Sequence, residues 1–358
     1  MSLLQHRPWL ATGLLAAMFA APSYGLPEPP KESPAEEAEG CLGCHEDPSI
    51  EVAFADGTRR TLQVDRNAFA QSVHFGKVAC SECHPGFQEI PHPERRYASE
   101  DEFRAGMRQA CQTCHFQDYS RYMDGVHHAV AKEGGAAPTC VDCHDAHAVT
   151  PPGKPRSRVS DTCSTCHSDV AETYANSVHG RLLAGPRPDD APVCTDCHRS
   201  HDIQDPRSQA FLLRTPETCG GCHSDTERMK PYGLSTKVMS TYLADFHGMT
   251  ASLAAPHAEG STRVTAVCVD CHGVHDITKV DEPGSKVMKE NLLKTCQQCH
   301  PDAAGDFPAA WLSHFEPSLE RAPLVYLTRQ FYVIFIPFVI GGLVLQILLH
   351  FWRVVVNR

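Results

Sequence analysis

The pattern Cys-x-x-Cys-His occurs nine times in this chain of 358 residues, and its nine copies use all 18 cysteines. In each copy two thiols are three residues apart and an imidazole follows the second thiol. This spacing is the attachment signal of a c-type haem, because the thiols reach the two vinyl groups of one porphyrin and the imidazole binds the iron. The cysteines are Cys41, Cys44, Cys80, Cys83, Cys111, Cys114, Cys140, Cys143, Cys163, Cys166, Cys194, Cys197, Cys219, Cys222, Cys268, Cys271, Cys296 and Cys299. The motif histidines are His45, His84, His115, His144, His167, His198, His223, His272 and His300.

Paired cysteines have two other common uses, in zinc sites and in disulfides. Neither use needs a histidine directly after the second cysteine, whereas every copy here has one. We therefore expect nine covalently bound c-type haems and no disulfide.

Nine haems with one motif histidine each need nine further axial ligands. Setting aside His6 near the N-terminus and His350 in an apolar C-terminal stretch, eleven histidines remain. Two of these, His128 and His257, are expected to be spare, although His127 and His128 can exchange roles. We expect the other nine to be distal ligands, which predicts a bis-histidine iron at every site. The predicted distal ligands are His74, His92, His127, His147, His179, His201, His247, His275 and His314.

The distal candidates recur at two registers, which reveals a repeat of two haem motifs. One histidine lies between the two motifs, as in Ser177-Val178-His179-Gly180, and another follows the second motif in the form CxxCHxxH. About four and a half repeats fill the chain. The first repeat is degenerate, because Phe87 stands where the others have the final histidine, and His92 is the expected substitute.

The CxxCHxxH form constrains which iron its last histidine can bind. His147, His201 and His275 each stand three residues after a motif histidine. Residues three apart on a helical turn share one face, so we expect each of the three to bind the haem of a neighbouring motif. A site with two histidine ligands has no open position for a substrate, which favours electron transfer over catalysis. If His92 fails as a ligand, its site becomes five-coordinate and could be catalytic.

The N-terminal 40 residues predict export followed by a linker. Residues 1–25 combine Arg7, an apolar stretch and a small-x-small end at Ser23-Tyr24-Gly25, which is typical of a signal peptide. An uncleaved N-terminal anchor is the alternative. Residues 26–40 are rich in Pro and Glu and are expected to be a solvated linker.

The C-terminal end predicts one membrane span. Residues 331–352 are long and apolar enough for a transmembrane helix, preceded by a juxtamembrane segment at 321–330. If the signal peptide exports the haem region, residues 353–358 form a cytoplasmic tail.

Between these ends, residues 41–320 are expected to form one nonahaem cytochrome c domain. About 30 residues per haem is too little protein for a conventional apolar core. The predicted fold is therefore mostly irregular with short α-helices, with a core dominated by haem and one C-terminal transmembrane helix.

The alternating SxHG and CxDCHxxH elements resemble the multihaem c-type cytochromes of the cytochrome c3, NapC/NirT and octahaem tetrathionate reductase groupings. The resemblance covers about residues 41–315. It implies electron transfer through covalently bound haem. Two departures matter: NapC/NirT proteins are anchored by an N-terminal helix, and no CxxCK motif of the catalytic relatives occurs here.

The predicted function is electron relay at the bacterial inner membrane, with the haem domain in the periplasm. The chain would connect the quinone pool, directly or through an integral-membrane partner such as a cytochrome b, with soluble periplasmic cytochromes, reductases or outer-membrane partners. A net charge of −11 disfavours nucleic acid and suits either a basic redox partner or simple solubility. The alternatives are a multihaem reductase of an oxidised nitrogen or sulfur compound, and a conducting filament.

Overall fold

The computed structural model describes residues 32–258, 265–310, 314–320 and 322–357. The predicted signal peptide and residues 26–31 of the predicted linker lie outside the described residues.

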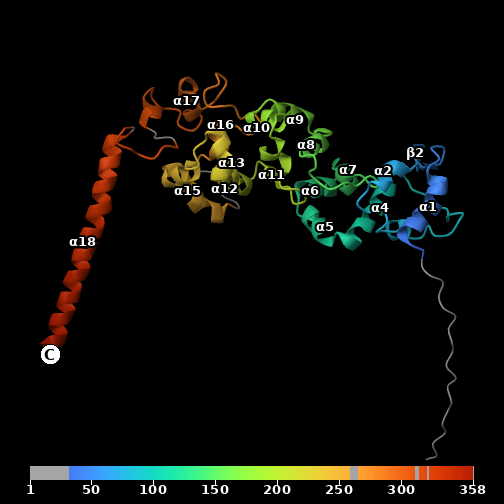
Figure 1. Cartoon of the computed structure of the whole chain (residues 1–358), viewed down its shortest axis with the longest axis horizontal. Helices are drawn as coiled ribbons and strands as arrows, with labels where there is room; N and C mark the ends of the chain where they lie inside the picture. Colours follow the sequence, from blue (N-terminus) through green and yellow to red (C-terminus); the bar gives the residue numbers. More distant parts are fainter. Residues whose placement is uncertain (1–31, 259–264, 311–313, 321, 358) are drawn as a thin grey trace, which may run out of the picture.

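The N-terminal half contains short helices and one small pair of strands (Figure 1). Its elements are α1 (Pro34–His45), β1 (Glu51–Ala53), β2 (Arg59–Thr61), α2 (Arg66–Ala70), α3 (Cys80–Cys83), α4 (Glu100–Cys114), α5 (Phe116–Met123), α6 (Val126–Lys132), α7 (Cys140–His144), α8 (Ser157–Ser164) and α9 (Ser168–Ala175).

The C-terminal half is helical and ends in a long single helix. Its elements are α10 (Val178–Leu183), η1 (Pro188–Asp190), α11 (Cys194–His198), α12 (Gln209–His223), α13 (Thr226–Met229), η2 (Lys230–Tyr232), α14 (Val238–Ala244), α15 (Phe246–Ala254), η3 (Ala255–His257), α16 (Cys268–His272), α17 (Lys289–Cys296), η4 (Phe307–Ala310) and α18 (Pro323–Val356).

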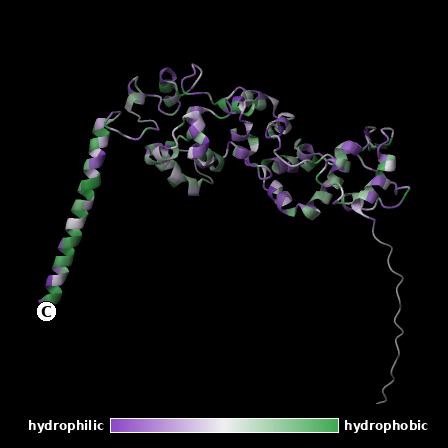
Figure 2. Ribbon diagram, in the orientation of Figure 1, coloured by the Kyte–Doolittle hydropathy of each residue, from purple (hydrophilic) through white to green (hydrophobic). Residues whose placement is uncertain are grey.

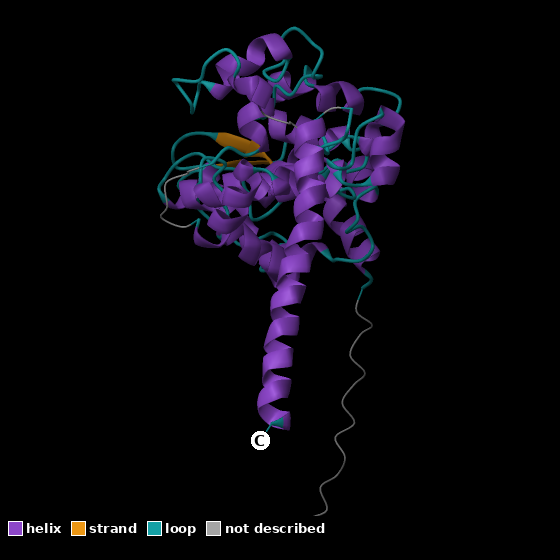
Figure 3. Ribbon diagram, turned by 90° about the vertical axis from the view of Figure 1, so that its left-hand side faces the viewer, coloured by secondary structure: helices purple, strands orange, loops and turns teal. Residues whose placement is uncertain are grey.

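The predicted fold class is confirmed. Short helices joined by irregular segments make up the region before α18, and within the described residues the only sheet is the antiparallel pair β1–β2 (Figure 3). Its register pairs Val52 with Arg60. The chain progresses broadly along the long axis of the molecule, from α1 at one end to α17 and α18 at the other (Figure 1).

Protein side chains alone build only a thin apolar core before α18. Eleven apolar residues are buried among those described, and several of them are alanines. The one connected cluster lies between α12 and α16 and consists of Leu213, Tyr242, Ala251, Ala258 and Val267. So little burial of side chains agrees with a domain that needs a large additional apolar component for its core.

The first helix begins inside the segment predicted as a linker. Ser33 caps α1, and Glu36 accepts hydrogen bonds from the Ser33 N–H and hydroxyl at 2.8 Å. This Ser-x-x-Glu capping box, with Pro34 at the first helical position, starts a helix that carries the first motif. Residues 34–40 are therefore helical, in contrast to the solvated linker expected for 26–40.

The C-terminal helix is longer than the predicted span. α18 includes residues 323–330, predicted as juxtamembrane, and most of the predicted tail at 353–358. Its side chains are exposed and its surface is mainly hydrophobic (Figure 2). Among the described residues it is the one helix long and apolar enough to cross a bilayer, so a single-pass membrane anchor is compatible with the structure.

Candidate haem-binding sites

The nine motifs occupy two kinds of helix end. The first motif of each repeat and the ninth motif lie at the carboxyl end of a helix, at α1, α4, α8, α12 and α17. The second motif of each repeat forms a short helix of its own, at α3, α7, α11 and α16. In examples of both kinds the N–H of the motif histidine donates to the first cysteine's carbonyl, as from His84 to Cys80 at 2.8 Å and from His300 to Cys296 at 2.9 Å. The two thiols and the imidazole therefore lie within about one helical turn.

A carboxylate inside each second motif stabilises the start of its short helix. It is the third residue of the motif and accepts a hydrogen bond at 2.6 to 2.7 Å from the N–H of the residue before the first cysteine. This bond gives a partner to a donor that a helix start leaves free, and it places negative charge at the positive helix end. The four carboxylates are Glu82, Asp142, Asp196 and Asp270.

A sharp turn follows the second motif in repeats two to four. The helices α7, α11 and α16 end at the motif histidine, and the next residue has positive φ. The two histidines of the CxxCHxxH form therefore do not share a helical face, and our expectation that they do is wrong. The turn directs the last histidine away from its own motif. The turn residues are Asp145, Arg199 and Gly273, with φ of 65°, 67° and 83°.

Every motif histidine lies beside one of the nine predicted distal histidines. The ring centroids of each pair are between 5.9 and 6.3 Å apart. The pairs are His45 with His92, His84 with His147, His115 with His74, His144 with His201, His167 with His127, His198 with His275, His223 with His179, His272 with His314, and His300 with His247.

This separation fits an iron held between two imidazoles. A metal–nitrogen bond of about 2 Å on each side, with about 1 Å from each nitrogen to its ring centre, gives a centroid separation of roughly 6 Å. The residues present at all nine pairs therefore fit the group that the motifs imply.

The pairing connects neighbouring repeats in both directions. The histidine between the two motifs of a repeat pairs with the first motif of the next repeat, as His127 does with His167. The histidine after the second motif pairs with the second motif of the previous repeat, as His201 does with His144. Each of the four boundaries between repeats therefore carries two pairs. The remaining pair, His45 with His92, lies within the first repeat.

One backbone hydrogen bond recurs at three of these boundaries. The N–H of the residue before one distal histidine donates to the carbonyl two residues after the other, from Val126 to Ile203 at 2.7 Å and from Val178 to Ile277 at 2.8 Å. Val73 donates to Val149 in the same way at 2.8 Å. At the fourth boundary, beside α18, a side-chain ion pair joins the two sides at 3.1 Å. It runs from Lys237 to Glu316.

The cysteines place consecutive motifs next to each other. Within a repeat, the thiols of the two first cysteines are in contact, as for Cys111 with Cys140 and Cys219 with Cys268. Between repeats, the second cysteine of one motif is close to the next motif, as for Cys143 and Cys166. The spatial order of the motifs therefore follows their order in the sequence.

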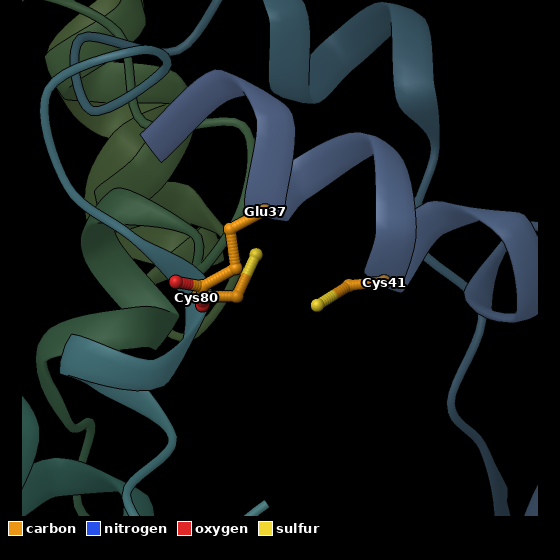
Figure 4. A group of neighbouring side chains, drawn as sticks. All are labelled: Glu37, Cys41 and Cys80. Atoms are coloured by element: carbon orange, nitrogen blue, oxygen red, sulfur yellow. The ribbon is translucent and has the colours of Figure 1, made fainter. Parts of the chain in front are cut away.

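The first repeat contains a group that resembles a metal site. Ligand atoms of Glu37, Cys41 and Cys80 lie within 4.8 Å of one another (Figure 4). Both thiols belong to haem motifs, and the Glu37 carboxylate accepts hydrogen bonds from the Ser81 N–H at 2.7 Å and hydroxyl at 3.1 Å. The carboxylate thus joins α1 to the start of α3, and we assign no further metal here.

Burial keeps several of the paired imidazoles neutral. Burial, with a smaller contribution from the charge of a neighbouring histidine, lowers the pKa of His84, His179 and His272 to about 4. The neutral ring is the form that binds a metal. At the first site, His45 Nδ1 lies 3.1 Å from the Leu62 carbonyl and His92 Nδ1 lies 2.8 Å from the Glu89 carbonyl. A ring that donates through Nδ1 has Nε2 free for a metal.

Three tyrosines position second motifs, and sequence reasoning missed them. The hydroxyls of Tyr122, Tyr174 and Tyr242 donate to a backbone carbonyl two residues before a second motif, for example from Tyr242 to Ala266 at 3.0 Å. Each tyrosine stands five residues before a distal histidine, a register that the repeat alignment could have revealed. The first repeat has Phe69 at this register.

The two histidines expected to be spare are not in these pairs. His128 contacts the ring of Tyr122, and His257 lies in η3 beside Ala258 and Ala210.

Residues 135–224 match the family model of cytochrome c3. The match includes the motifs that begin at Cys140, Cys163, Cys194 and Cys219. It supports a multihaem cytochrome c that binds its haem covalently and transfers electrons. A search of curated proteins and a search of solved structures found no match.

Proposed function

We propose that this chain is a membrane-anchored periplasmic cytochrome with nine bis-histidine c-type haems. It relays electrons between the quinone pool and redox partners in the periplasm or outer membrane. The observation that carries the proposal is the set of nine histidine pairs, which together use every motif histidine and every predicted distal ligand.

The chain holds its nine sites in a linear order. Bound haem supplies a one-electron couple between ferric and ferrous iron. The proximity of cysteines in consecutive motifs supports a path through the sites in sequence order. The histidines shared across repeat boundaries keep neighbouring sites at fixed positions relative to each other.

We infer that the chain is an electron carrier and not an enzyme. Each motif histidine already has a distal partner, so no site is left with an open position for a substrate. The second candidate is a reductase of an oxidised nitrogen or sulfur compound. It would use the first site, since His92 is the one exposed residue among the nine distal ligands.

The membrane end of the path is its C-terminal end. The last distal ligand, His314, stands nine residues before Pro323, the first residue of α18, and pairs with the eighth motif at His272. A quinone site or an integral-membrane partner such as a cytochrome b would therefore exchange electrons with the last sites. Export by the predicted signal peptide would place these sites on the periplasmic side of the inner membrane.

The test is purification of the full chain from membranes in mild detergent. We expect a mass increase of nine haems, low-spin spectra, a co-purifying membrane subunit or direct reduction by a quinol analogue. Fewer haems would contradict the nonahaem assignment. A chain that purifies alone and is not reduced by quinol would contradict the link to the quinone pool.

A matched pair of variants tests the direction of the path. Removing the ninth site with Cys296→Ser and Cys299→Ser should slow reduction of the other eight haems by quinol, because that site is next to the membrane end. Removing the first site with Cys41→Ser and Cys44→Ser should leave this rate within about twofold. Equal slowing in both variants would contradict the proposed order.

A further inference from the structure

The distal histidine of the first site differs from the other eight in exposure. His92 is exposed, whereas each of the other eight distal histidines is half-buried. It also differs in origin, because it pairs with a motif of its own repeat while the others reach across a repeat boundary. The first site is thus closed by a local segment.

That segment, Pro85–Arg96, is held mainly by its own contacts. Among the described residues, every hydrogen bond that we find for it joins two of its members: Gly86 N–H to Gln88, His92 to Glu89, and Arg95 to the Pro85 carbonyl at 3.1 Å.

Ring contacts complete the attachment of the segment. Phe87 packs edge-on against His92 at 5.4 Å, and the Arg95 guanidinium lies 4.2 Å above the Phe87 ring. Phe87 also contacts His84 at 6.5 Å, and His92 itself faces His45. Apart from Phe87, the residues from Pro85 to Arg96 are exposed.

The motif side of the same site is anchored more firmly. His45 ends the twelve-residue helix α1, its Nδ1 donates to the Leu62 carbonyl, and its own carbonyl accepts from the Val64 N–H at 2.7 Å. If one of the two imidazoles leaves the iron, it is therefore His92.

We propose that His92 is an exchangeable ligand, and that the site of Cys41, Cys44 and His45 binds a small uncharged ligand of ferrous iron, of the carbon monoxide and nitric oxide class. This inference rests on the proposed haem at the first motif. The incoming ligand's lone pair replaces that of His92 Nε2, so one coordinate bond breaks, one forms, and no electron is transferred.

The charges of the segment favour an uncharged ligand. It carries two carboxylates and two guanidinium groups, at Glu89, Glu94, Arg95 and Arg96, so their formal charges cancel. An anion gains no net attraction from this segment, whereas a neutral diatomic molecule needs only space at the iron.

The experiment is titration of the dithionite-reduced full-length protein with carbon monoxide, followed by difference spectroscopy. We expect about one carbon monoxide per chain. His92→Ala should also bind one, but faster, because no imidazole has to dissociate first. In the native protein the rate should level off at high carbon monoxide concentration, whereas in His92→Ala it should rise in proportion to the concentration.

His179→Ala is the matched control, because it removes a half-buried distal ligand at an inner boundary. It should bind two carbon monoxide molecules per chain, one at each site. Two bound by His92→Ala would show that the exchangeable site is elsewhere and would overturn the proposal. No binding to the native protein would also overturn it, and nine low-spin haems in that sample would leave the proposed function intact.

Discussion

The first and third repeats contain the same two motifs but use their last histidine in opposite ways. In the third repeat the chain turns at Arg199, and His201 pairs with His144 of the repeat before. In the first repeat the turn has Gly86 at φ 84°, and His92 returns to His45 of the same repeat. Residues 1–40 hold no CxxCH motif, so a histidine of the first repeat that was directed backwards would meet no earlier motif there. Distal histidines of the inner sites therefore connect neighbouring repeats, whereas the distal histidine of the first site pairs within its own repeat.

The largest expected effect separates the two kinds of distal ligand. His179→Ala should lower the free energy of unfolding by about 3 kcal/mol, because it removes a half-buried histidine whose pairing with His223 joins two repeats. His92→Ala should cost about 1 kcal/mol or less, because its segment is exposed. Thermal unfolding followed by far-ultraviolet circular dichroism measures both. Equal losses of unfolding free energy in the two variants would contradict the view that inner distal histidines stabilise the chain more than His92 does.

The next largest effect concerns the turn that directs the last histidine. Gly273→Ala should lower the free energy of unfolding by about 1 to 3 kcal/mol, because φ is 83° and the added Cβ would overlap the Asp276 carboxylate. Arg199→Gly should stabilise the chain by up to about 1 kcal/mol, because it relieves positive φ at the equivalent position. Both are measured by denaturant unfolding.

Gly305→Ala is the control for these turns, since no atom lies within 4 Å of the added Cβ. It should stay within about 0.5 kcal/mol of the native protein. A destabilising Arg199→Gly would mean that the turn tolerates side chains without strain.

A smaller effect tests the tyrosines that the first repeat lacks. Tyr174→Phe should cost about 1 kcal/mol, because the Pro192 carbonyl loses its hydroxyl donor. Burial raises the pKa of Tyr174 to about 12, so the hydroxyl keeps its proton at neutral pH. The control is Tyr119→Phe, since within the described residues we find no hydrogen bond from the Tyr119 hydroxyl. Chemical unfolding of both variants should show a loss only in Tyr174→Phe.

The smallest effect is expected at the boundary beside α18. Lys237 and Glu316 are more than half exposed, so Lys237→Ala should cost at most about 0.5 kcal/mol and nothing at high salt. Unfolding at two ionic strengths measures this. A loss of stability that persists in high salt would indicate that Lys237 contributes more than a surface ion pair between two exposed side chains.

The sequence predicts the residues of the sites better than their partners. Motif spacing and histidine supply predict His74 and His314 as distal ligands, but not which motif histidine each one faces, because that depends on turns and on the packing of separate repeats. We expected His147 to face a neighbouring motif because it would share a helical face with His144. It does face one, at His84, but the reason is different, since α7 ends at His144 and a turn follows. The choice between His127 and His128 likewise required the orientation of α6.

The boundaries of the helices can likewise be predicted only in part from the sequence. The apolar run predicted the C-terminal helix, yet α18 also includes Arg329 and Arg353, since a helix that has formed gains one backbone hydrogen bond for each further residue, whether that residue is apolar or charged. The start of α1 could be read from Ser33, Pro34 and Glu36, but composition alone made that segment look like a linker. Capping residues therefore indicate a helix start that the average composition of the segment does not.

The two-way pairing also fixes an order of maturation. Synthesis proceeds from the N-terminus, and the first site is complete as soon as His92 has been made. The second and third sites each combine histidines of the first two repeats. His84 can pair only after His147 has been made, and His74 only after His115 has been made. The same dependence recurs at each boundary, and His272 finds its partner only when His314 is made, immediately before the helix that would hold the chain in the bilayer. The site for which we propose an exchangeable ligand is therefore finished first, and the site whose distal histidine stands just before α18 is finished last.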